Sequence, residues 1–398
     1  MGINRAYDQV QACGLYQKPP GLRGKYDNVR RFWEDELTRR HLQPYLVRLL
    51  KRQTRIRICD LGCGSGDGYE LLTDAAKPYG RKARVIPREL VEVYTGIDIN
   101  PGLLAQAGQI FGRESGVRFE QADFRRGLPV AGEPPYHIYL ANYGTLSHCR
   151  DRELVDLLAQ VADQAADGSL IIADWLGCFA YEWQDFWVAQ PPPDYMIPYV
   201  ISYFQDNPAQ ERPELDVFDL RLMHPATLRN LIREVSREAG VSVQIREIFD
   251  RSIFVGRHIE TAEYHPHPQP LRTLVNSLFE RDCHTDLAEL IVHYEPKTGF
   301  DELNAWFCRL QAAWNALVRF ADELLAGKAP QESPELPPGA ARVLRQLLTA
   351  ARDLDPDDAR ANLIEPQLGC LLRRLEDGFQ AGRGAGHALC AILEIKKE

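Results

Sequence analysis

The segment ICDLGCGSGDG, at residues 58–68, constrains the fold of this chain more than any other feature. An apolar run ends at Asp60, and a helix-like run, YELL, begins directly after the segment. Four glycines separate the two runs: Gly62, Gly64, Gly66 and Gly68. Glycine permits the positive φ and the close approach that such a turn needs, so that backbone N–H groups and a helix N-terminus face a ligand. The segment therefore predicts a strand, turn and helix that bind a small molecule.

The glycine spacing excludes two common versions of this turn. A dinucleotide-binding turn has glycines at its first, third and sixth positions, but the sixth position counted from Gly62 is Asp67. The chain also lacks the G-x-x-x-x-G-K-[ST] pattern of a phosphate-binding P-loop. We therefore expect neither a dinucleotide fingerprint nor a P-loop.

From residue 55 to about 259, short β-branched runs alternate with helix-like stretches, which is typical of a parallel sheet with helices on both faces. Only Asp250 and Arg251 separate the last two runs, so we expect these to form an antiparallel hairpin at the sheet edge. The expected strands cover residues 55–60, 92–99, 117–123, 137–142, 169–175, 241–249 and 252–259.

The 398 residues are enough for two or three domains at about 150 residues each. We expect an N-terminal helical cap at 1–54, a ligand-binding α/β domain at 55–260 and a mostly helical C-terminal domain at 265–398, whose tail ALCAILEIKK has the composition of a strand. Residues 176–225 form a long aromatic-rich insertion after a predicted strand, which favours a lid or a substrate-binding module over a simple loop.

Composition narrows the class of protein. A net charge of -9 weakens the case for nucleic acid as the main ligand, because phosphate binding needs a concentrated basic face. Nine cysteines without a C-x-x-C pair indicate reduced thiols rather than disulfides or a zinc finger. The chain shows no signal-peptide pattern and no apolar run long enough for a membrane span. We expect a cytoplasmic protein.

The pattern D-x-G-x-G-x-G at residues 60–66 resembles motif I of the class I S-adenosylmethionine-dependent methyltransferases. The resemblance continues at the expected strand ends, with Asp98 in GIDIN, Asp123 in QADF, and then LANYGTLSH and DGSLIIADW. It covers about residues 26–260 and implies an α/β fold with a Rossmann-like seven-stranded, mostly parallel sheet that ends in an antiparallel hairpin. It also implies S-adenosyl-L-methionine as the cofactor.

The resemblance assigns cofactor contacts to particular positions. Asp98 would accept the ribose hydroxyls and Ile99 would pack on the adenine, while Asp123 and the Phe124 N–H would bind the adenine edge. Asp60 would lie near the ammonium group, and the backbone of Gly62, Cys63 and Gly64 would pass the ribose and the carboxypropyl chain. The Asn142 carbonyl would face the amino-acid part, and Tyr26 and Arg31 would contact its carboxylate. Asp98 and Asp123 as strand-end caps, and Tyr26 and Arg31 as solvated or structural residues, are the alternatives.

Three residues near the expected catalytic edge are candidates for the transfer step: His148, Asp174 and Tyr143. A base is needed only where the accepting atom carries a proton. His148 as a residue that fixes its loop, and Tyr143 in a similar role, are the alternatives. The histidines of YHPHPQP belong more simply to a Pro-rich linker than to a metal site, so we expect no metal.

We expect a methyltransferase that acts on an oxygen or nitrogen of a small molecule. Its acceptor pocket would come from aromatic residues of the 176–225 insertion, among them Trp183, Trp187, Tyr195, Tyr199 and Tyr203; the alternative is an insertion that packs its own core or a dimer contact. Other readings are a protein or RNA methyltransferase that recognises its substrate through the helical C-terminal region, and a non-catalytic binding module. We expect no membrane partner, and a homodimer is possible.

Overall fold

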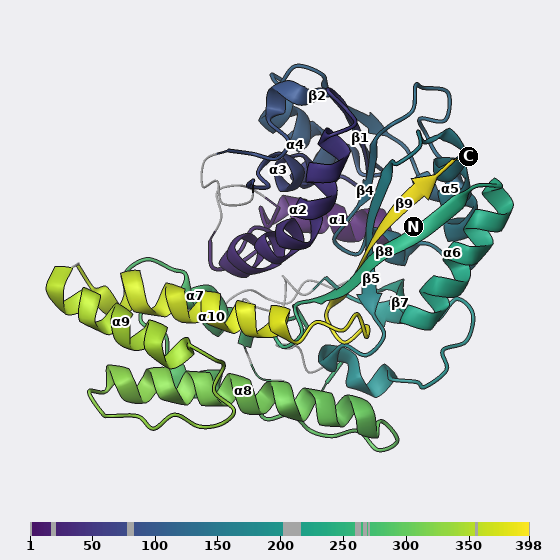
Figure 1. Cartoon of the computed structure of the whole chain (residues 1–398). Helices are drawn as coiled ribbons and strands as arrows, with labels where there is room; N and C mark the ends of the chain where they lie inside the picture. Colours follow the sequence, from purple (N-terminus) through teal and green to yellow (C-terminus); the bar gives the residue numbers. More distant parts are fainter. Residues whose placement is uncertain are drawn as a thin grey trace.

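The computed structural model describes residues 2–16, 21–77, 83–201, 216–258, 264–265, 269, 271–354 and 357–397. A mostly parallel sheet forms its centre, with helices on both faces (Figure 1). Five parallel strands lie in the order β3-β2-β1-β4-β5. Their bounds are Ile56–Leu61 (β1), Val91–Asp98 (β2), Val117–Gln121 (β3), Ile138–Ala141 (β4) and Leu170–Gly177 (β5). The expected Rossmann-like α/β fold is confirmed.

The strand order reverses direction between β1 and β4, which is the point where open α/β sheets bind ligands. β1 and β4 are largely buried on both faces, which explains their continuous apolar sequences. The carboxyl end of β2 is fixed by the next helix, α4 (Pro101–Phe111), because its cap Asn100 accepts the N–H of Leu103 at 3.0 Å. Asp98, at the end of β2, is thereby held at this crevice.

The expected terminal hairpin is wrong. The strand β8 (Ser242–Arg251) continues through Asp250 and Arg251, and residues 252–258 form no strand. Its partner is the C-terminal strand β9 (Ala388–Lys396), which lies antiparallel between β8 and β5 (Figure 1). The tail expected within the helical region therefore belongs to the sheet.

Asp250 explains this arrangement physically. Its side chain is fully buried, whereas a two-residue hairpin turn would expose it. The carboxylate accepts the backbone N–H groups of Arg383, Gly384 and Ala385 at 2.8, 2.8 and 2.9 Å. Asp250 thus holds the segment that leads into β9, and about 135 residues are inserted between two strands that lie side by side.

Both faces of the sheet are covered by amphipathic helices. One face packs against α2 (Asp35–Leu50) and α3 (Asp67–Thr73), with Leu42 and Leu46 of α2 against the buried strand residues. The other face packs against α5 (Asp151–Gln164) and α6 (Pro225–Ala239). Before α2 lie α1 (Gly2–Ala12) and a π-helical turn, Arg30–Glu34.

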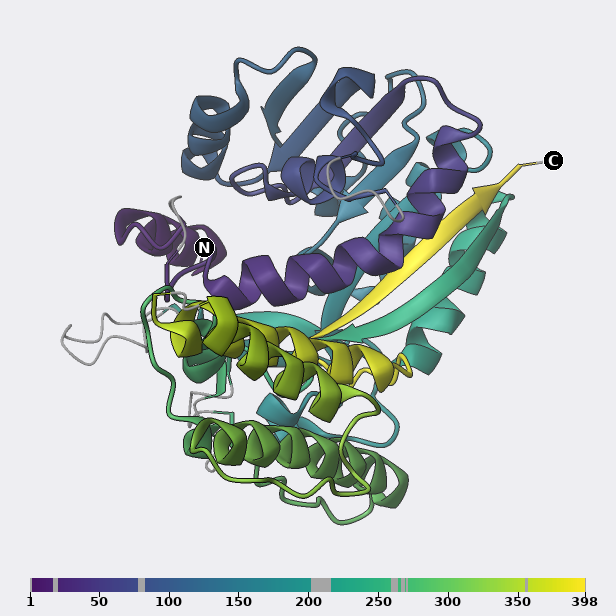
Figure 2. The same ribbon diagram turned by 60° about the vertical axis from the view of Figure 1, so that its left-hand side comes forward.

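The helices inserted between β8 and β9 gather beyond one end of the sheet (Figure 2). They are α7 (Leu271–Leu278), α8 (Asp301–Leu325), α9 (Ala340–Leu354) and α10 (Glu365–Gly378). Trp33 from the N-terminal region is fully buried among them and donates to Glu376 of α10 at 3.1 Å. The N-terminal segment and the helical region therefore share one apolar core.

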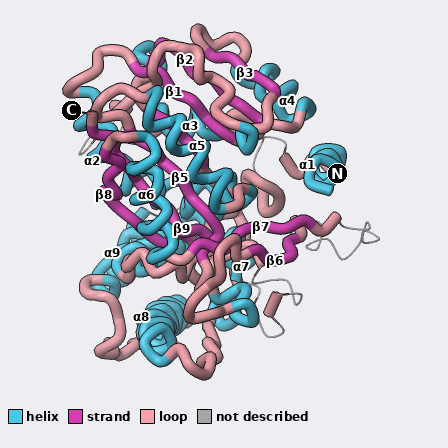
Figure 3. Tube along the Cα trace, turned by 90° about the vertical axis from the view of Figure 1, so that its right-hand side faces the viewer, coloured by secondary structure: helices cyan, strands magenta, loops and turns pink. Residues whose placement is uncertain are grey.

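The 176–225 insertion contributes core as well as surface. Trp183 and Trp187 are almost fully buried, and the Trp187 ring stacks on Phe307 of α8 with centroids 5.7 Å apart. Tyr195 donates to the Phe186 carbonyl at 2.6 Å. The insertion also forms a hairpin of β6 (Met196–Tyr199) and β7 (Phe218–Met223), which lies on the same side of the molecule as α1 (Figure 3). Tyr203 lies outside the described residues.

Candidate active site

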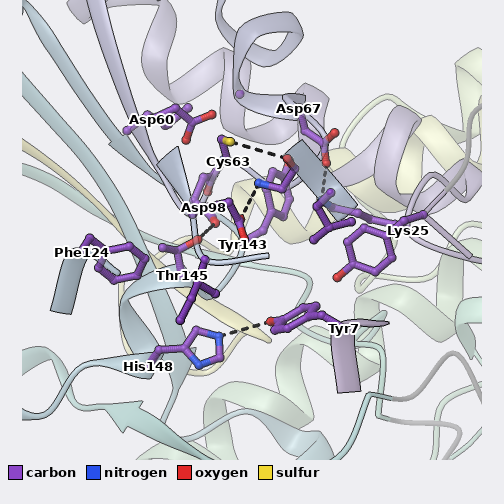
Figure 4. Close-up of a pocket in the computed structure, with 18 of the residues that line it drawn as sticks. Tyr7, Lys25, Asp60, Cys63, Asp67, Asp98, Phe124, Tyr143, Thr145 and His148 are labelled. Atoms are coloured by element: carbon purple, nitrogen blue, oxygen red, sulfur yellow. Dashed lines mark hydrogen bonds and ion pairs between the residues drawn. The ribbon is translucent and has the colours of Figure 1, made fainter. Parts of the chain in front are cut away.

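A cleft opens at the carboxyl ends of β1, β2 and β4 (Figure 4). All the sequence-predicted site residues except Tyr26, Arg31 and Asp174 line it. These lining residues are Asp60, Gly62, Cys63, Gly64, Asp98, Ile99, Asp123, Phe124, Asn142, Tyr143 and His148. The sequence analysis missed further lining side chains: Tyr7, Tyr16, Lys25, Asp67, Leu103, Arg125, Leu140 and Thr145.

The glycine loop after β1 has no room for side chains on the cleft side. Gly62 and Gly64 have φ of +68° and +53°, which only glycine adopts without strain. A Cβ on Gly62 would lie 2.8 Å from Oγ1 of Thr145, and one on Gly64 would lie 2.9 Å from Nζ of Lys25. The loop backbone therefore forms the floor of the cleft.

Asp98 connects the glycine loop to the end of β2. Its carboxylate accepts the N–H of Gly64 at 2.8 Å on one oxygen and that of Asn100 at 2.9 Å on the other. A carboxylate oxygen can accept more than one hydrogen bond, so Asp98, which lines the cleft, keeps acceptor capacity. Burial raises the pKa of Asp98, while the N–H donors act in the opposite direction.

Asp60 lies deeper, beneath the loop. It accepts a hydrogen bond from the Tyr94 hydroxyl, and its carboxylate crowds the position where Gly68 would carry a Cβ. Burial raises the pKa of Asp60 to about 7, against the opposing effects of Tyr94 and Lys25. Asp60 thus supports the loop from below as well as lining the cleft.

Asp123 is held at the rim by Arg125, which the sequence analysis missed. Its carboxylate accepts the backbone N–H of Arg125 at 3.1 Å and the guanidinium N–H groups at 2.9 and 2.8 Å. The guanidinium holds the pKa of Asp123 below its usual range. The carboxylate is therefore an oriented acceptor beside the mostly buried ring of Phe124.

Tyr26 and Arg31, the residues expected to contact the carboxylate of the ligand, do not line the cleft. Tyr26 is buried away from the cleft and Arg31 is exposed. Lys25 lies in the cleft instead, with Nζ 2.7 Å from an oxygen of Asp67. Adjacent side chains of a turn or helix point in different directions. A shift of one position, from Tyr26 to Lys25, therefore exchanges a side chain outside the cleft for one inside it.

Asp174, expected as a catalytic candidate, is fully buried and does not line the cleft. Its carboxylate accepts the N–H of Tyr143 at 2.8 Å and that of Gly144, and forms an ion pair with buried Arg251. Tyr143 and Gly144 have φ of +61° and +79°, an arrangement that aims successive N–H groups at one anion. Asp174 is thus a positioning residue for the turn after β4.

Tyr143 and His148 both line the cleft, but only His148 has the character of a base. The Tyr143 hydroxyl bonds to Asp35, and burial is the main cause that raises its pKa well above the ordinary value. For His148, burial lowers the pKa to about 4, so the imidazole is neutral at pH 7. Its Nε2 lies 3.3 Å from the Tyr7 hydroxyl, and within the described part of the chain Nδ1 has no hydrogen-bond partner.

The sheet order and the glycine loop at its switch point define a Rossmann-like α/β protein. A scan against protein-family models finds no match. Among curated proteins, the chain is similar to the trans-aconitate 2-methyltransferase of Methylobacterium nodulans, with 37% identity over 86 residues. The aligned part is 22% of this chain and 26% of the relative, so the chain spans about a quarter of the length of the curated relative it matches.

Two solved structures show partial similarity. One is an S-adenosylmethionine-dependent methyltransferase from Clostridium acetobutylicum, with 13% identity, 61% of this chain and 90% of that chain covered, and a TM-score of 0.38. The other is CalS10, an amino pentose methyltransferase from Micromonospora echinaspora, with 14% identity, coverage of 61% and 91%, and a TM-score of 0.34.

The part of the chain that the structure describes contains neither a membrane-spanning helix nor a metal-binding cluster. No helix there is both long and apolar enough to cross a membrane. No group of three or more His, Cys, Asp or Glu side chains in the same residues is arranged to hold a metal ion.

Proposed function

We propose that this chain is an S-adenosyl-L-methionine-dependent methyltransferase that acts on a small-molecule acceptor. The observation that carries the proposal is the bond between the Gly64 N–H and Asp98, which places a glycine-floored turn and a carboxylate with spare acceptor sites on one wall of the cleft. The local similarity to a curated methyltransferase supports the same activity.

The polar and apolar groups that line the cleft match the parts of this cofactor. Asp98 would accept the two ribose hydroxyls, and Ile99 with Phe124 would enclose the adenine, whose amino group would donate to Asp123. The cofactor's own carboxylate needs a cation at the other end, and Lys25 supplies one above the glycine loop. Asp60 and the Asn142 carbonyl would face the ammonium group. When bound, the cofactor supplies an activated methyl group on a positively charged sulfur.

The protein's part in the transfer is to orient the acceptor and exclude water. His148, neutral at pH 7, would take the proton of an acceptor hydroxyl or amine. Tyr7 would hold the imidazole through the contact to Nε2, and Asp174 would hold the backbone of Tyr143 and Gly144. His148 is thus the proposed catalytic residue, and Asp174 and Tyr7 are positioning residues.

Calorimetry with S-adenosylhomocysteine and NAD tests the proposed function directly. We expect saturable binding of S-adenosylhomocysteine and none of NAD, because the loop has the glycine spacing of the first ligand and lacks the sixth-position glycine of the second. Binding of NAD together with no response to S-adenosylhomocysteine would contradict the proposal.

The protonation state of His148 gives a separate prediction. The pKa of this imidazole is lowered to about 4 in the folded protein from an ordinary value near 6.5, so the unfolded chain binds its proton first as the pH falls. We expect the His148 imidazole resonance to titrate near pH 4, and the stability it contributes to fall as the pH drops from 6.5 toward 4. Proton NMR measures this, with His148→Gln identifying the resonance, and titration near 6.5 would show an open, solvated ring.

A further inference from the structure

A second cavity, of about 710 Å³, adjoins the cofactor cleft. The two share five lining residues: Tyr7, Tyr16, Lys25, Tyr143 and His148. Asp98 and Asp123 line only the cleft, so the second cavity lies beyond the shared residues, away from the proposed ribose and adenine contacts. A molecule bound there would meet the cofactor beside His148, which is the position that an acceptor needs.

The wall of this second cavity is cationic. Lys25, Arg30, Arg251 and Arg257 line it, whereas Glu34 is the one carboxylate among its lining residues in the described part of the chain. The carboxylates that pair with the three arginines do not line the cavity and lie behind it: Asp35, Asp174 and Asp27. Lys25 likewise pairs with Asp67, so four cationic side chains line this cavity while their carboxylate partners do not.

Glu34 does not offset this charge toward a ligand. One of its oxygens already accepts from Arg272 at 2.9 Å and from the Ser252 hydroxyl at 3.0 Å. The neighbouring cations, Arg272 first among them, hold the pKa of Glu34 well below its ordinary value despite its burial. Glu34 is therefore an ionised lining residue of the cavity, and one of its oxygens is paired with buried Arg272.

The arginines differ in the donors that they present. Both Nη nitrogens of Arg251 donate to protein oxygens, on Thr38, Asn142 and Asp174. Both Nη nitrogens of Arg257 also donate to protein oxygens, at 3.3–3.5 Å. Arg30 donates through Nε to Asp35 at 2.9 Å, while its Nη2 stands 3.8 Å from Asp67 and neither Nη nitrogen donates a hydrogen bond within the described residues. Arg30 therefore has a pair of N–H groups with which to bind an oxyanion in the bidentate manner.

The remaining wall is apolar. Leu176, Ile201 and Leu220 line it together with the Tyr199 ring, all of them from the 176–225 insertion. This part of the insertion faces the cavity, in contrast to Trp183 and Trp187, which pack in the protein core. A carbon skeleton could lie against this wall while a charged group faces Arg30.

We propose that the acceptor is a small oxyanion, a carboxylate or a phosphate ester, whose charged group binds at Arg30, within the field of the neighbouring Arg257, and whose carbon skeleton packs on Leu176, Ile201 and Leu220. This proposal rests on the proposed function, because it names the substrate class of the same site. Lys25, which lines both cavities, keeps its proposed role as the cation that binds the cofactor's carboxylate.

The test uses the full chain saturated with S-adenosylhomocysteine and four probes with one carbon tail: hexanoate, hexyl phosphate, hexanol and hexylamine. Ligand-observed NMR or calorimetry measures binding. We expect hexanoate or hexyl phosphate to bind at least about tenfold more tightly than hexanol, which is about 1.4 kcal/mol, and hexylamine to bind most weakly. The better of the two anions identifies the oxyanion. Equal binding of all four, or preference for hexylamine, would overturn the proposal.

Matched arginine variants locate the charge. Arg30→Gln should weaken the preferred anion at least tenfold, whereas Arg31→Gln, which makes the same charge change at an exposed neighbour, should leave it unchanged. Arg257→Gln provides a second variant if Arg30→Gln does not fold. Unchanged anion binding in a folded Arg30 or Arg257 variant would overturn the assignment. If the unmodified chain did not bind S-adenosylhomocysteine, this result would instead contradict the proposed function itself.

Discussion

A chain that ends at His387 should not fold, because it lacks β9. This strand lies between β5 and β8 and pairs with both along its length. Four of its aliphatic side chains, Leu389, Ile392, Leu393 and Ile395, are fully buried. At about 1.5–3 kcal/mol each, they contribute roughly 6–12 kcal/mol, which is comparable to the total stability of a typical domain, about 5–15 kcal/mol. Circular dichroism and urea unfolding would measure the loss.

The matched control for this truncation ends at Lys396 and keeps the whole of β9. It loses two exposed contacts of Lys397, from the backbone N–H to Asp167 at 3.0 Å and from Nζ to the Asp163 carbonyl at 2.5 Å, so its unfolding transition should be almost unchanged. If the chain ending at His387 showed the transition of the full chain and the same affinity for S-adenosylhomocysteine, β9 would not be part of the folded sheet.

Asp98→Ala should weaken S-adenosylhomocysteine binding by about 2–4 kcal/mol, that is about 30- to 900-fold. The change removes the charged acceptor that we propose for the two ribose hydroxyls. It also leaves the N–H groups of Gly64 and Asn100 without their acceptor, so the glycine loop loses one of its anchors. Calorimetry gives the affinity, and thermal unfolding shows how much of the loss comes from the fold.

Asp98→Asn removes the negative charge of the side chain but keeps its shape. An amide oxygen can still accept one of the two N–H groups, so we expect a smaller loss than for alanine. Glu120→Ala is the matched control, because it removes a negatively charged side chain on the neighbouring strand β3, outside the cleft. This change should leave the affinity for S-adenosylhomocysteine unchanged. Wild-type affinity in a folded Asp98→Ala protein would identify Asp98 as a strand-end cap and would leave the ribose contact to another residue.

The position of the inserted helices matters for the site. The chain leaves the sheet after β8 and returns in β9, and Ser252 and His387, at the two ends of the insertion, are joined by a backbone hydrogen bond of 2.8 Å. Arg251, directly before the insertion, pairs with Asp174 behind the turn of Tyr143. Arg257, within the insertion, lines the second cavity. The helical region is therefore anchored at the same edge of the sheet as the proposed acceptor site.

The amino-acid sequence by itself determined the parallel half of the sheet and most of the residues that line the cleft. Glycine spacing, apolar strands and acidic strand ends are local patterns, and the right-handed α/β connectivity brings the ends of parallel strands to one edge. Asp98, Asp123 and the glycine loop were therefore predictable without coordinates. The burial of Trp183 and Trp187 was an open alternative, because a stretch of aromatic residues has the same composition in a lid and in a core.

The tertiary structure alone decided three things. The pairing of two strands that are some 135 residues apart leaves no local pattern in the sequence. The buried Asp250, which binds the backbone of residues 383–385, brings β9 beside β8 in the tertiary structure. The direction of a side chain within a turn depends on the packing around it, which placed Lys25 rather than Tyr26 in the cleft. Long-range charge pairing placed Asp174 on buried Arg251 instead of at the cleft, because a buried carboxylate needs a partner that no nearby residue in the sequence supplies.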